Sequence, residues 1–312
     1  MYLSLFSGVE ASSVACDGMG WEALAFSEID PFPSAVIAKR FPGIPNLGDV
    51  TKVDWRSFVK NCGRPDLVVG GSPCQSFSIA GKREGLQGES GLMREYVRAV
   101  REVRPDWLLW ENVPGALSSS HGEDFGCLLK SLDALGNGLA WRVLDAQFFG
   151  LDQRRERVFL VGRLGDPDGP CQVLFDPDCL QWNHPQGREK RAQLAASAGR
   201  GTSRADVFCM TDTHAHSSVS DDGTCGTLSC HSRKDPPVVL ATVGSQIRRL
   251  TPRECERLQG FPDDWTLIPW KGRPAEECPD GPRYKAMGTS LAVPVMRWLF
   301  ERMDAYEGGH HE

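Results

Sequence analysis

Short apolar runs alternate with amphipathic stretches along the first 165 residues. The runs have the length of buried strands and lie at residues 3–6, 23–26, 67–69 and 107–110. Stretches with apolar side chains three and four positions apart predict helices at residues 11–19, 92–103 and 125–135. Residues 143–149 and 157–161 are expected to form a closing strand pair. Strands that alternate with helices in this way predict a doubly wound α/β sheet.

The pattern changes after about residue 165. Residues 166–245 are rich in Gly, Pro, Asp, Ser, Thr and His and contain few periodic segments, which predicts a loop-rich second domain. A helix is then expected in RLTPRECERLQGFP, with Thr251 as N-cap, Pro252 in the first turn and Glu254 completing a capping box. The stretch GPRYKAMGTSLAVPVMRWLF predicts an apolar helix near the end of the sequence, followed by a polar tail at residues 306–312.

Composition narrows the class of protein. The 312 residues are 40% hydrophobic and 24% charged, as in soluble globular proteins. No apolar run approaches the ~18 residues that span a membrane, and no Lys or Arg precedes Lys39, so neither a membrane helix nor a signal peptide is expected. We therefore expect a cytoplasmic protein. The net charge of −6 argues against general nucleic-acid binding, although a local basic cleft remains compatible with it.

The eleven cysteines are scattered and odd in number, which favours free thiols over a disulfide framework. No Cys-x2-Cys pair occurs, so no metal site is expected. The residues weighed for such a site are Cys209, His214, His216, Cys225, Cys230 and His231.

Polar residues follow the predicted strands, at the ends where α/β sheets bind ligands. Gly8 allows a ligand to approach the backbone, although Glu10 stands where a second glycine would complete the usual pattern. Glu28 is placed to accept hydrogen bonds from ribose hydroxyls, and Asp49 from an adenine amine. A solvated acid at a strand end explains Glu28 equally well.

Cys74 directly follows a proline in the stretch GGSPCQSFS, at the end of an apolar run. It is either a small packing residue or a nucleophile, and a nucleophile needs surroundings that favour the thiolate. Glycines at positions 81, 85, 88 and 91 make the next stretch a candidate lid, which Lys82, Arg83 and Arg94 would make attractive to phosphate.

Arg155 and Arg157 lie two residues apart in QRRERVFLVG, which places them on one face of a predicted strand. They are either site residues or part of an exposed basic edge. Glu111, in ENV, supplies an acid after the apolar run at residues 107–110.

Five segments follow one another along the chain in this order: GGSPCQSFS, ENVPG, QRRERVFLVG, RRLTPRECERLQGFPDDW and YKAMGTSLAVPV. Together they resemble the C5-cytosine DNA methyltransferase family, over most of residues 1–163 and 246–300. The single short variable region is similar to that of monospecific bacterial or phage enzymes.

The resemblance implies a Rossmann-like sheet that uses S-adenosyl-L-methionine, with a smaller, loop-rich target-recognition domain. The expected boundaries are 1–165 for the catalytic and cofactor domain, 166–265 for target recognition (variable over 166–245), 266–305 for the return to the catalytic domain and 306–312 for the tail.

The resemblance also implies a chemistry. The Cys74 thiolate would attack cytosine C6, and Glu111 would hydrogen bond N3 and the exocyclic amine. Arg157 would reach the O2 edge, and Arg155 would hold the catalytic loop or a phosphate. Because a stacked base cannot be reached, the cytosine must be flipped out of the duplex.

The cofactor residues implied by the resemblance are Phe6, Gly8, Glu28, Ile29, Asp49, Val50, Pro73, Ser290 and Leu291. The implied DNA contacts are Gln75, Ser78, Lys82, Arg83, Gln153, Thr227, Leu228 and Arg233. Two positions depart from the family pattern, since Glu10 replaces a glycine and Thr289 replaces an asparagine. Neither departure removes a catalytic group, so an active enzyme is expected.

The expected partner is double-stranded DNA, with a restriction endonuclease encoded nearby as a candidate second partner and a monomer as the expected state. The alternatives are an RNA C5-cytosine methyltransferase, a catalytically silent DNA- or cofactor-binding protein, and an ordinary thiol-containing α/β protein. The stretch PCQ and the long insert favour DNA, and the four groups Cys74, Glu111, Arg155 and Arg157 argue against a silent protein.

Overall fold

The computed structural model describes residues 1–72, 90–175, 207–213, 216–220, 238–241 and 246–308. The chain divides into two compact units. The first unit comprises Met1–Leu144, Glu156–Leu180 and Arg297–Glu312, and the second comprises Asp145–Arg155 and Gln181–Met296.

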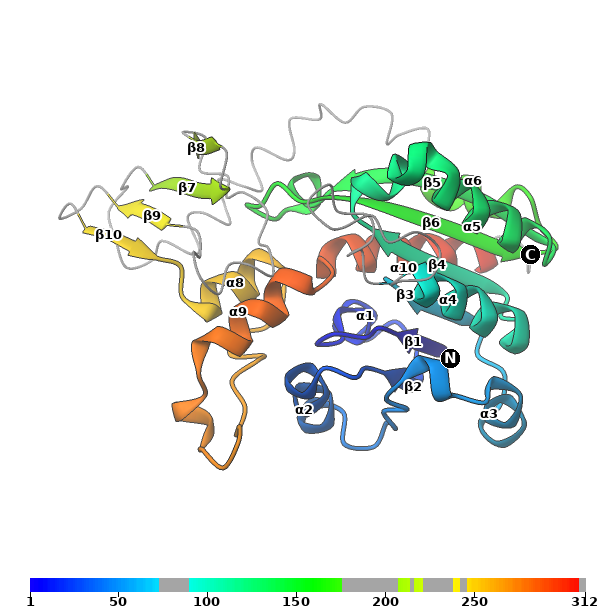
Figure 1. Cartoon of the computed structure of the whole chain (residues 1–312), viewed down its shortest axis with the longest axis horizontal. Helices are drawn as coiled ribbons and strands as arrows, with labels where there is room; N and C mark the ends of the chain where they lie inside the picture. Colours follow the sequence, from blue (N-terminus) through cyan, green and yellow to red (C-terminus); the bar gives the residue numbers. More distant parts are fainter. Residues whose placement is uncertain (73–89, 176–206, 214–215, 221–237, 242–245, 309–312) are drawn as a thin grey trace. The chain divides into compact units, whose positions relative to one another are not determined.

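The first unit is built on a six-stranded sheet in the order β2-β1-β3-β4-β6-β5 (Figure 1). Its strands are β1 (Tyr2–Leu5), β2 (Ala23–Ser27), β3 (Leu67–Gly70), β4 (Trp107–Asn112), β5 (Asn137–Asp145) and β6 (Glu156–Leu164). Strands β2, β1, β3 and β4 are parallel, whereas β6 runs antiparallel to β4. The predicted doubly wound α/β fold is confirmed.

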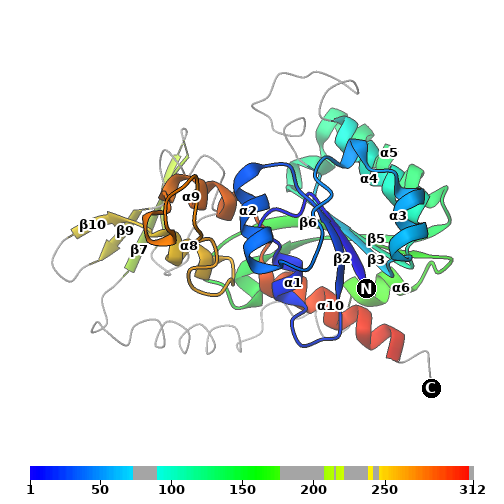
Figure 2. The same cartoon turned by 90° about the horizontal axis from the view of Figure 1, so that it is seen from below.

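Helices cover both faces of this sheet, with α3, α4 and α5 on one face and α1, α6 and α10 on the other (Figure 2). The helices are α1 (Ala11–Ala15), α2 (Pro31–Arg40), α3 (Trp55–Cys62), α4 (Ser90–Val103), α5 (Glu123–Asp133), α6 (Gly169–Leu174) and α10 (Val293–Gly308). Short 3-10 turns are η1 (Val50–Lys52), η2 (Pro114–Leu117), η3 (Ser119–Gly122) and η4 (Ala146–Phe149).

Successive side chains of β1 point to opposite faces of the sheet and therefore pack against different helices. Leu3 and Leu5 enter the apolar cluster beneath α3, α4 and α5. Tyr2 points the other way, where its ring meets Phe300 of α10 edge-on at 5.9 Å. Ser4 lies on the same side as Tyr2, because side chains alternate along a strand. The side of the sheet that carries α1 therefore has two buried polar groups on its first strand.

Three expectations about local structure are corrected. Helix α1 ends at Ala15 rather than near residue 19, where a series of turns replaces it. The strand expected at 143–149 begins instead at Asn137 and ends at Asp145, whose carboxylate caps the 3-10 turn that follows. Helix α10 continues through Gly308, so Tyr306 is buried in the first unit and is not part of the expected polar tail.

The second unit contains a four-stranded antiparallel sheet in the order β10-β9-β7-β8. Its strands are β7 (Val207–Thr213), β8 (His216–Ser220), β9 (Val238–Ala241) and β10 (Gln246–Arg249). Strands β7, β8 and β9 lie in the stretch 166–245 that we expected to be rich in loops, and β10 directly follows it.

The helical part of the second unit comprises α8 (Pro252–Leu258), η7 (Ala275–Glu277) and α9 (Asp280–Thr289). The capping box of Thr251 and Glu254 is present, as predicted. The single apolar helix expected near the end of the sequence is instead two helices, α9 and α10, separated at Ser290–Ala292 by an extended backbone.

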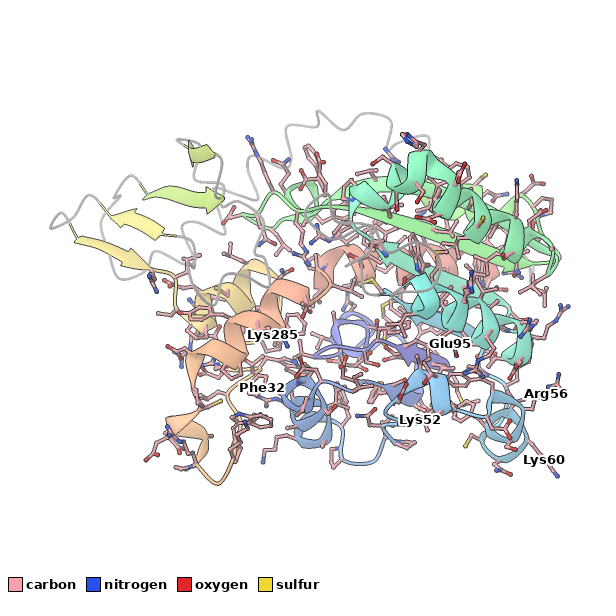
Figure 3. All side chains as sticks on the ribbon, viewed as in Figure 1. Phe32, Lys52, Arg56, Lys60, Glu95 and Lys285 are labelled. Carbon is pink, nitrogen blue, oxygen red and sulfur yellow. The ribbon has the colours of Figure 1, made fainter. Side chains whose placement is uncertain are left out.

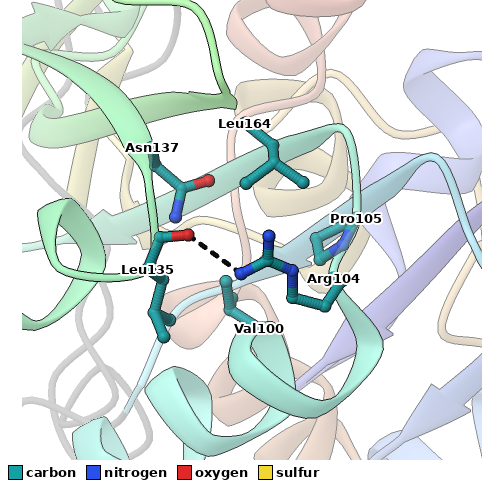
Figure 4. Close-up of a pocket in the computed structure, with 6 residues that line it drawn as sticks. All are labelled: Val100, Arg104, Pro105, Leu135, Asn137 and Leu164. Carbon is teal, nitrogen blue, oxygen red and sulfur yellow. Dashed lines mark hydrogen bonds between the residues drawn. The ribbon is translucent and has the colours of Figure 1, made fainter.

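A hollow at the amino end of β4 lies among Val100, Arg104, Pro105, Leu135, Asn137 and Leu164 (Figure 4). The Arg104 guanidinium crosses it and donates a hydrogen bond to the Leu135 carbonyl at 3.0 Å. Because the chemistry-bearing residues of the parallel strands lie at the carboxyl ends, this hollow is at the other edge of the sheet from them.

Candidate active site

The strand register brings several predicted residues to one edge of the first unit's sheet. Leu5 pairs with Ser27 on one side and with Gly70 on the other, and Gly70 pairs with Trp110. The residues that follow these strand positions, Phe6, Glu28, Gly71 and Glu111, therefore share this edge. The chain order reverses between β1 and β3, which is where doubly wound sheets open a crevice for a ligand.

Glu111 and Arg157 form an ion pair at this edge, with Arg157 Nε 3.2 Å from Glu111 Oε1. Both side chains are largely shielded, with 13% of Glu111 and 15% of Arg157 exposed. Glu111 lies near the end of β4, and Arg157 lies near the start of the antiparallel neighbour β6. The pairing comes from the reversed direction of β6, which places its first residues beside the last residues of β4.

Ser72 is fixed against β4 by two hydrogen bonds. Its hydroxyl accepts from Trp110 Nε1 at 3.1 Å, and its carbonyl accepts from Asn112 Nδ2 at 3.0 Å. Ser72 and Asn112 are both buried. Sequence reasoning missed these three residues as site residues, although Ser72 lies only two positions before Cys74. The backbone is therefore anchored directly before the predicted nucleophile.

Gly71 approaches Glu111 so closely that a larger residue would not fit. A Cβ at Gly71 would lie 2.9 Å from Glu111 Oε2 and 3.3 Å from the Glu111 carbonyl oxygen. The second glycine of GGSPC thus leaves space for the carboxylate, which explains a small residue at this position.

Several predicted site residues lie outside the described residues. They are Pro73, Cys74, Gln75, Ser78, Lys82, Arg83, Thr227, Leu228 and Arg233. Their roles stay predictions.

Arg155 does not share a strand face with Arg157, which corrects that expectation. Strand β6 begins at Glu156, and Arg155 belongs to the second unit. Its amide donates to Asp145 Oδ1 at 2.9 Å, and its guanidinium donates to the Ser290 carbonyl at 2.6 Å. Arg155 is buried, so it holds the backbone before α10 in place rather than lining an exposed basic edge.

The turn after β1 has an unusual backbone. Phe6, Gly8 and Glu10 all have positive φ, at 54°, 57° and 64°. This conformation is costly for phenylalanine and glutamate and is typical of functional turns. A Cβ placed on Gly8 would meet nothing within 4 Å, so the backbone there is open to a ligand.

Glu28 supports that turn from the end of β2. Its Oε2 accepts from Gly8 N at 2.8 Å, and its Oε1 accepts from Asp30 N at 2.7 Å. Burial raises the pKa of Glu28, and these two backbone hydrogen bonds partly oppose that rise. A carboxylate has about four acceptor positions, so Glu28 retains capacity for two hydroxyl donors. The neighbouring Ile29 exposes 69% of its side chain, which suits an apolar cover for an aromatic ring.

Asp49 and Val50 follow in the same unit. Asp49 caps η1, since its Oδ1 accepts from Thr51 N at 3.0 Å and Thr51 Oγ1 at 2.7 Å. The Thr51 hydrogen bonds hold the pKa of Asp49 below its usual value. Val50 is buried, and its carbonyl accepts a hydrogen bond from Arg98. Their contacts with a cofactor stay predictions.

The remaining predicted residues belong to the second unit. Ser290 is buried, and Leu291 follows it in the extended link before α10. Thr289 ends α9 and donates to the Ala286 carbonyl at 3.1 Å. Gln153 is fully buried, and its side-chain amide has no hydrogen-bond partner among the described residues. Its DNA contact stays a prediction.

Exposed basic side chains of the first unit lie on η1 and α3. Lys52 pairs with Asp49 at 3.4 Å, and Arg56 and Lys60 project from α3 (Figure 3). On α4, Glu95 pairs with Arg98 at 2.6 Å. Within the described parts of the chain, no helix is long and apolar enough to cross a membrane.

Comparisons with known proteins identify relatives of this chain. The family model for C-5 cytosine-specific DNA methylases matches residues 1–195 and 202–305. The chain is 31% identical to the type II methyltransferase M2.BsuMI of Bacillus subtilis, over 98% of this chain and 76% of that protein. It is also 31% identical to a protein of Escherichia phage P1 named DNA N-6-adenine-methyltransferase, over 97% of this chain. The chain spans 61% of the length of that phage protein.

A solved structure shares the fold. It is that of an E. coli protein titled a DNA modification methyltransferase encoded within a prophage, with a TM-score of 0.66 and 20% identity. The alignment covers 98% of this chain and 99% of that chain. The protein belongs to the family of C-5 cytosine-specific DNA methylases.

Proposed function

We propose that the protein transfers a methyl group from S-adenosylmethionine to C5 of a cytosine that it flips out of a specific short sequence in double-stranded DNA. The observation that carries this proposal is the Glu111–Arg157 pair beside the anchored Ser72. A two-residue span reaches at most about 7 Å, so Cys74 stays within that reach of Ser72. The proposal places the Cys74 thiol at the same edge of the sheet as the Glu111 carboxyl.

The proposed mechanism follows from the low nucleophilicity of cytosine C5. This carbon is a poor nucleophile until a thiolate adds to C6, which forms a C–S bond and moves electron density towards C5 and N3. Protonated Glu111 would donate a hydrogen bond to N3 and neutralise the charge that develops there, and its carbonyl oxygen would accept from the exocyclic amine. Arg157, held by Glu111, would reach O2 on the same base edge. Once C5 carries the methyl group, loss of the C5 proton to a base and breaking of the C–S bond restore the aromatic ring and release Cys74 as a thiolate.

The cofactor residues of the first unit fit S-adenosylmethionine. Glu28 has acceptor capacity for ribose hydroxyls, Gly8 leaves the backbone open, and Ile29 offers an exposed apolar surface. When bound, S-adenosylmethionine supplies the electrophilic methyl group. Cofactor contacts of Ser290 and Leu291 are also part of the proposal, and within their own unit Arg155 donates a hydrogen bond to the Ser290 carbonyl.

A role in protecting DNA within a restriction-modification system is part of the proposal. Its support is the name of the Bacillus subtilis relative, a type II methyltransferase. We propose that residues 166–245 supply the sequence recognition, with Thr227, Leu228 and Arg233 among the contacts, and that the protein acts as a monomer.

Adenine N6 methylation is the second candidate, because the phage P1 relative carries that name. An exocyclic amine attacks a methyl donor directly and needs no thiol addition to a ring carbon. The GGSPC and ENV segments, with Cys74 and Glu111, favour cytosine. The phage protein also extends well beyond the matched part, so its name describes a longer molecule.

The deciding experiment is incubation of unmethylated genomic DNA with the pure protein and S-adenosylmethionine, followed by sequencing that reads 5-methylcytosine and N6-methyladenine at single-base resolution. The proposal expects 5-methylcytosine at one short fixed sequence. Methylation of adenine alone, or of added RNA alone, would overturn it. Cys74→Ser should abolish the reaction while DNA and cofactor binding persist, and retained turnover would remove Cys74 from its role.

A further inference from the structure

Glu10 is buried at the turn where a ligand would approach β1. Only 1% of the residue is exposed, and its backbone is left-handed, with φ 64°. Glu10 caps α1, since its Oε1 accepts from Ser13 N at 3.1 Å. Its other oxygen accepts from Ser4 Oγ at 2.8 Å, and Tyr2 Oη donates to Oε1 at 3.3 Å.

All of the donors around this carboxyl are neutral. Ser13 Oγ contributes a further hydrogen bond at 3.2 Å, and it also contacts Tyr2 Oη. Among the described residues, no Arg or Lys pairs with Glu10. A buried carboxylate without a cation is costly unless hydrogen bonds or a nearby positive charge stabilise it. Tyr2, Ser4 and Ser13 form a polar cage around the carboxyl. This cage supplies hydrogen-bond donors for the ionised form but no positive charge.

Burial and hydrogen bonding together bring the pKa of the Glu10 carboxyl close to neutral pH. Burial raises the pKa of Glu10 from 4.5 to about 7, and the hydrogen bonds from Ser4, Ser13 and Tyr2 oppose the rise. A positive charge arriving near the turn would favour ionisation. Glu10 follows Gly8 by two residues, so their Cα atoms lie within about 7 Å of each other.

We propose that Glu10 is a specificity-determining residue of the cofactor pocket, whose carboxylate makes the pocket prefer the positively charged methyl donor over its uncharged product. The inference rests on the proposed function, because it requires S-adenosylmethionine at the β1 turn. The donor carries a sulfonium cation, whereas S-adenosylhomocysteine carries a neutral thioether and is otherwise alike. The same carboxylate therefore attracts one ligand and not the other.

The other titratable and charged groups near the cage do not mimic this effect. Burial raises the pKa of Tyr2 well above 10 and that of Cys16 to about 11, so both stay neutral near pH 7. From α10, Arg297 binds the carbonyls of Ala15 and Asp17, at the far end of α1. Glu28 accepts a hydrogen bond from Gly8 N, so it is a second acid at this turn whose effect the comparison of variants must separate from that of Glu10.

The test is calorimetric titration of the full chain with S-adenosylmethionine and with S-adenosylhomocysteine, at about pH 6 and about pH 8.5. The measured quantity is the ratio of the two dissociation constants. The sulfonium lowers the pKa of the donor's own amino group, so the contribution of the ligand is removed by comparing the wild-type protein with Glu10→Gln, which meets the same two ligands. A unit charge about 10 Å from a carboxylate, partly screened by salt, changes affinity roughly threefold to tenfold.

For the wild-type protein we expect the preference for the donor to grow roughly threefold to tenfold between about pH 6 and about pH 8.5. Glu10→Gln should lose this part of the pH dependence, because Glu28 and both ligands are unchanged while the charge at Glu10 is gone. Glu10→Gly, which also relieves the left-handed backbone, should do the same and replaces the Gln variant if that fails to fold. Ser4→Ala removes one donor to the carboxylate, so it should move the change in preference to higher pH.

Two results would overturn the inference. One is a wild-type preference that does not change with pH, and the other is an equal change in Glu10→Gln. Failure of the wild-type protein to bind either ligand would instead overturn the proposed cofactor site, and this inference with it.

Discussion

Arg157 Nε lies 3.2 Å from Glu111 Oε1, across two strands that run in opposite directions. Two parallel strands bring their last residues to the same edge of the sheet, whereas an antiparallel strand brings its first residues there. The reversed strand β6 brings a cation to the carboxylate. The pair thus gives the proposed base-binding group a fixed orientation before DNA arrives.

Glu111→Gln tests the carboxyl directly. The amide keeps the shape but cannot carry the proton that N3 requires, so single-turnover methyl transfer should slow by about 10²–10⁴-fold. Cofactor and DNA affinities should change little, which filter binding and calorimetry can check. A rate near that of the wild-type protein would mean that another group protonates the base.

Arg157→Lys separates charge from geometry. Lysine retains the positive charge but lacks the planar fork, so it should hold Glu111 less rigidly. We expect the methyl-transfer rate to fall about tenfold for Lys and about 10²-fold for Ala, by analogy with other losses of a positioned charge. Equal rates for the wild type and Arg157→Ala would show that the pair has no role in turnover.

Local patterns predicted the local features well. The capping box of Thr251 and Glu254 depends on residues three positions apart, so it could be predicted before any tertiary contact was known. The strand-helix alternation likewise predicted the sheet and placed Glu28 and Glu111 at one edge.

Features that depend on long-range contacts could not be predicted in this way. The left-handed backbone at Phe6 and Glu10 occurs in a turn where Gly8 donates to Glu28 and where Ser4 and Tyr2 donate to Glu10, and residue spacing does not encode these contacts. Glu10 looked like a departure from a glycine pattern, and its partners showed why a glutamate fits there. The four strands of the second unit also escaped prediction, because composition dominated by turn-forming residues masked their alternation.

Ser72→Ala should affect both stability and rate. It leaves the buried Trp110 indole N–H without its acceptor, which costs about 1–3 kcal/mol in the free energy of unfolding. It also loosens the backbone before Cys74, so we expect methyl transfer to slow by up to about 10²-fold. The matched control is Ser131→Ala on the exposed face of α5, which should change the free energy of unfolding by less than about 0.5 kcal/mol. Similar losses in both variants, measured by denaturant unfolding, would count against the role of Ser72.

Arg283→Met tests the buried ion pair of the second unit. Arg283 Nη2 lies 3.0 Å from Glu256 Oε1, with 7% of Arg283 and none of Glu256 exposed. Removing the cation leaves a buried, unpaired charge and should cost about 3–5 kcal/mol in the free energy of unfolding. Arg257→Met, in the same unit, breaks the exposed pair with Asp263 and should cost at most about 1 kcal/mol. The double variant with Glu256→Met and Arg283→Met should recover part of the lost free energy of unfolding. If it does not, the loss in Arg283→Met comes from packing and not from the unpaired charge.

The acidity of Glu10 gives folding stability a pH dependence of known sign. Its pKa is raised from 4.5 to about 7 in the folded protein, so between these values the unfolded chain is ionised while the folded one retains the proton. Stability contributed by this group is therefore full below about pH 4.5 and falls as pH rises towards 7, by about 3 kcal/mol in total. Glu10→Gln cannot ionise, so the free energy of unfolding of the wild type minus that of the variant should decrease by about this amount between pH 5 and pH 8. Subtraction removes the contribution of Glu28, whose pKa is also raised. A difference that stays constant across this range would mean that Glu10 is ionised at all of these pH values, and that its cage stabilises the charge fully without a cation.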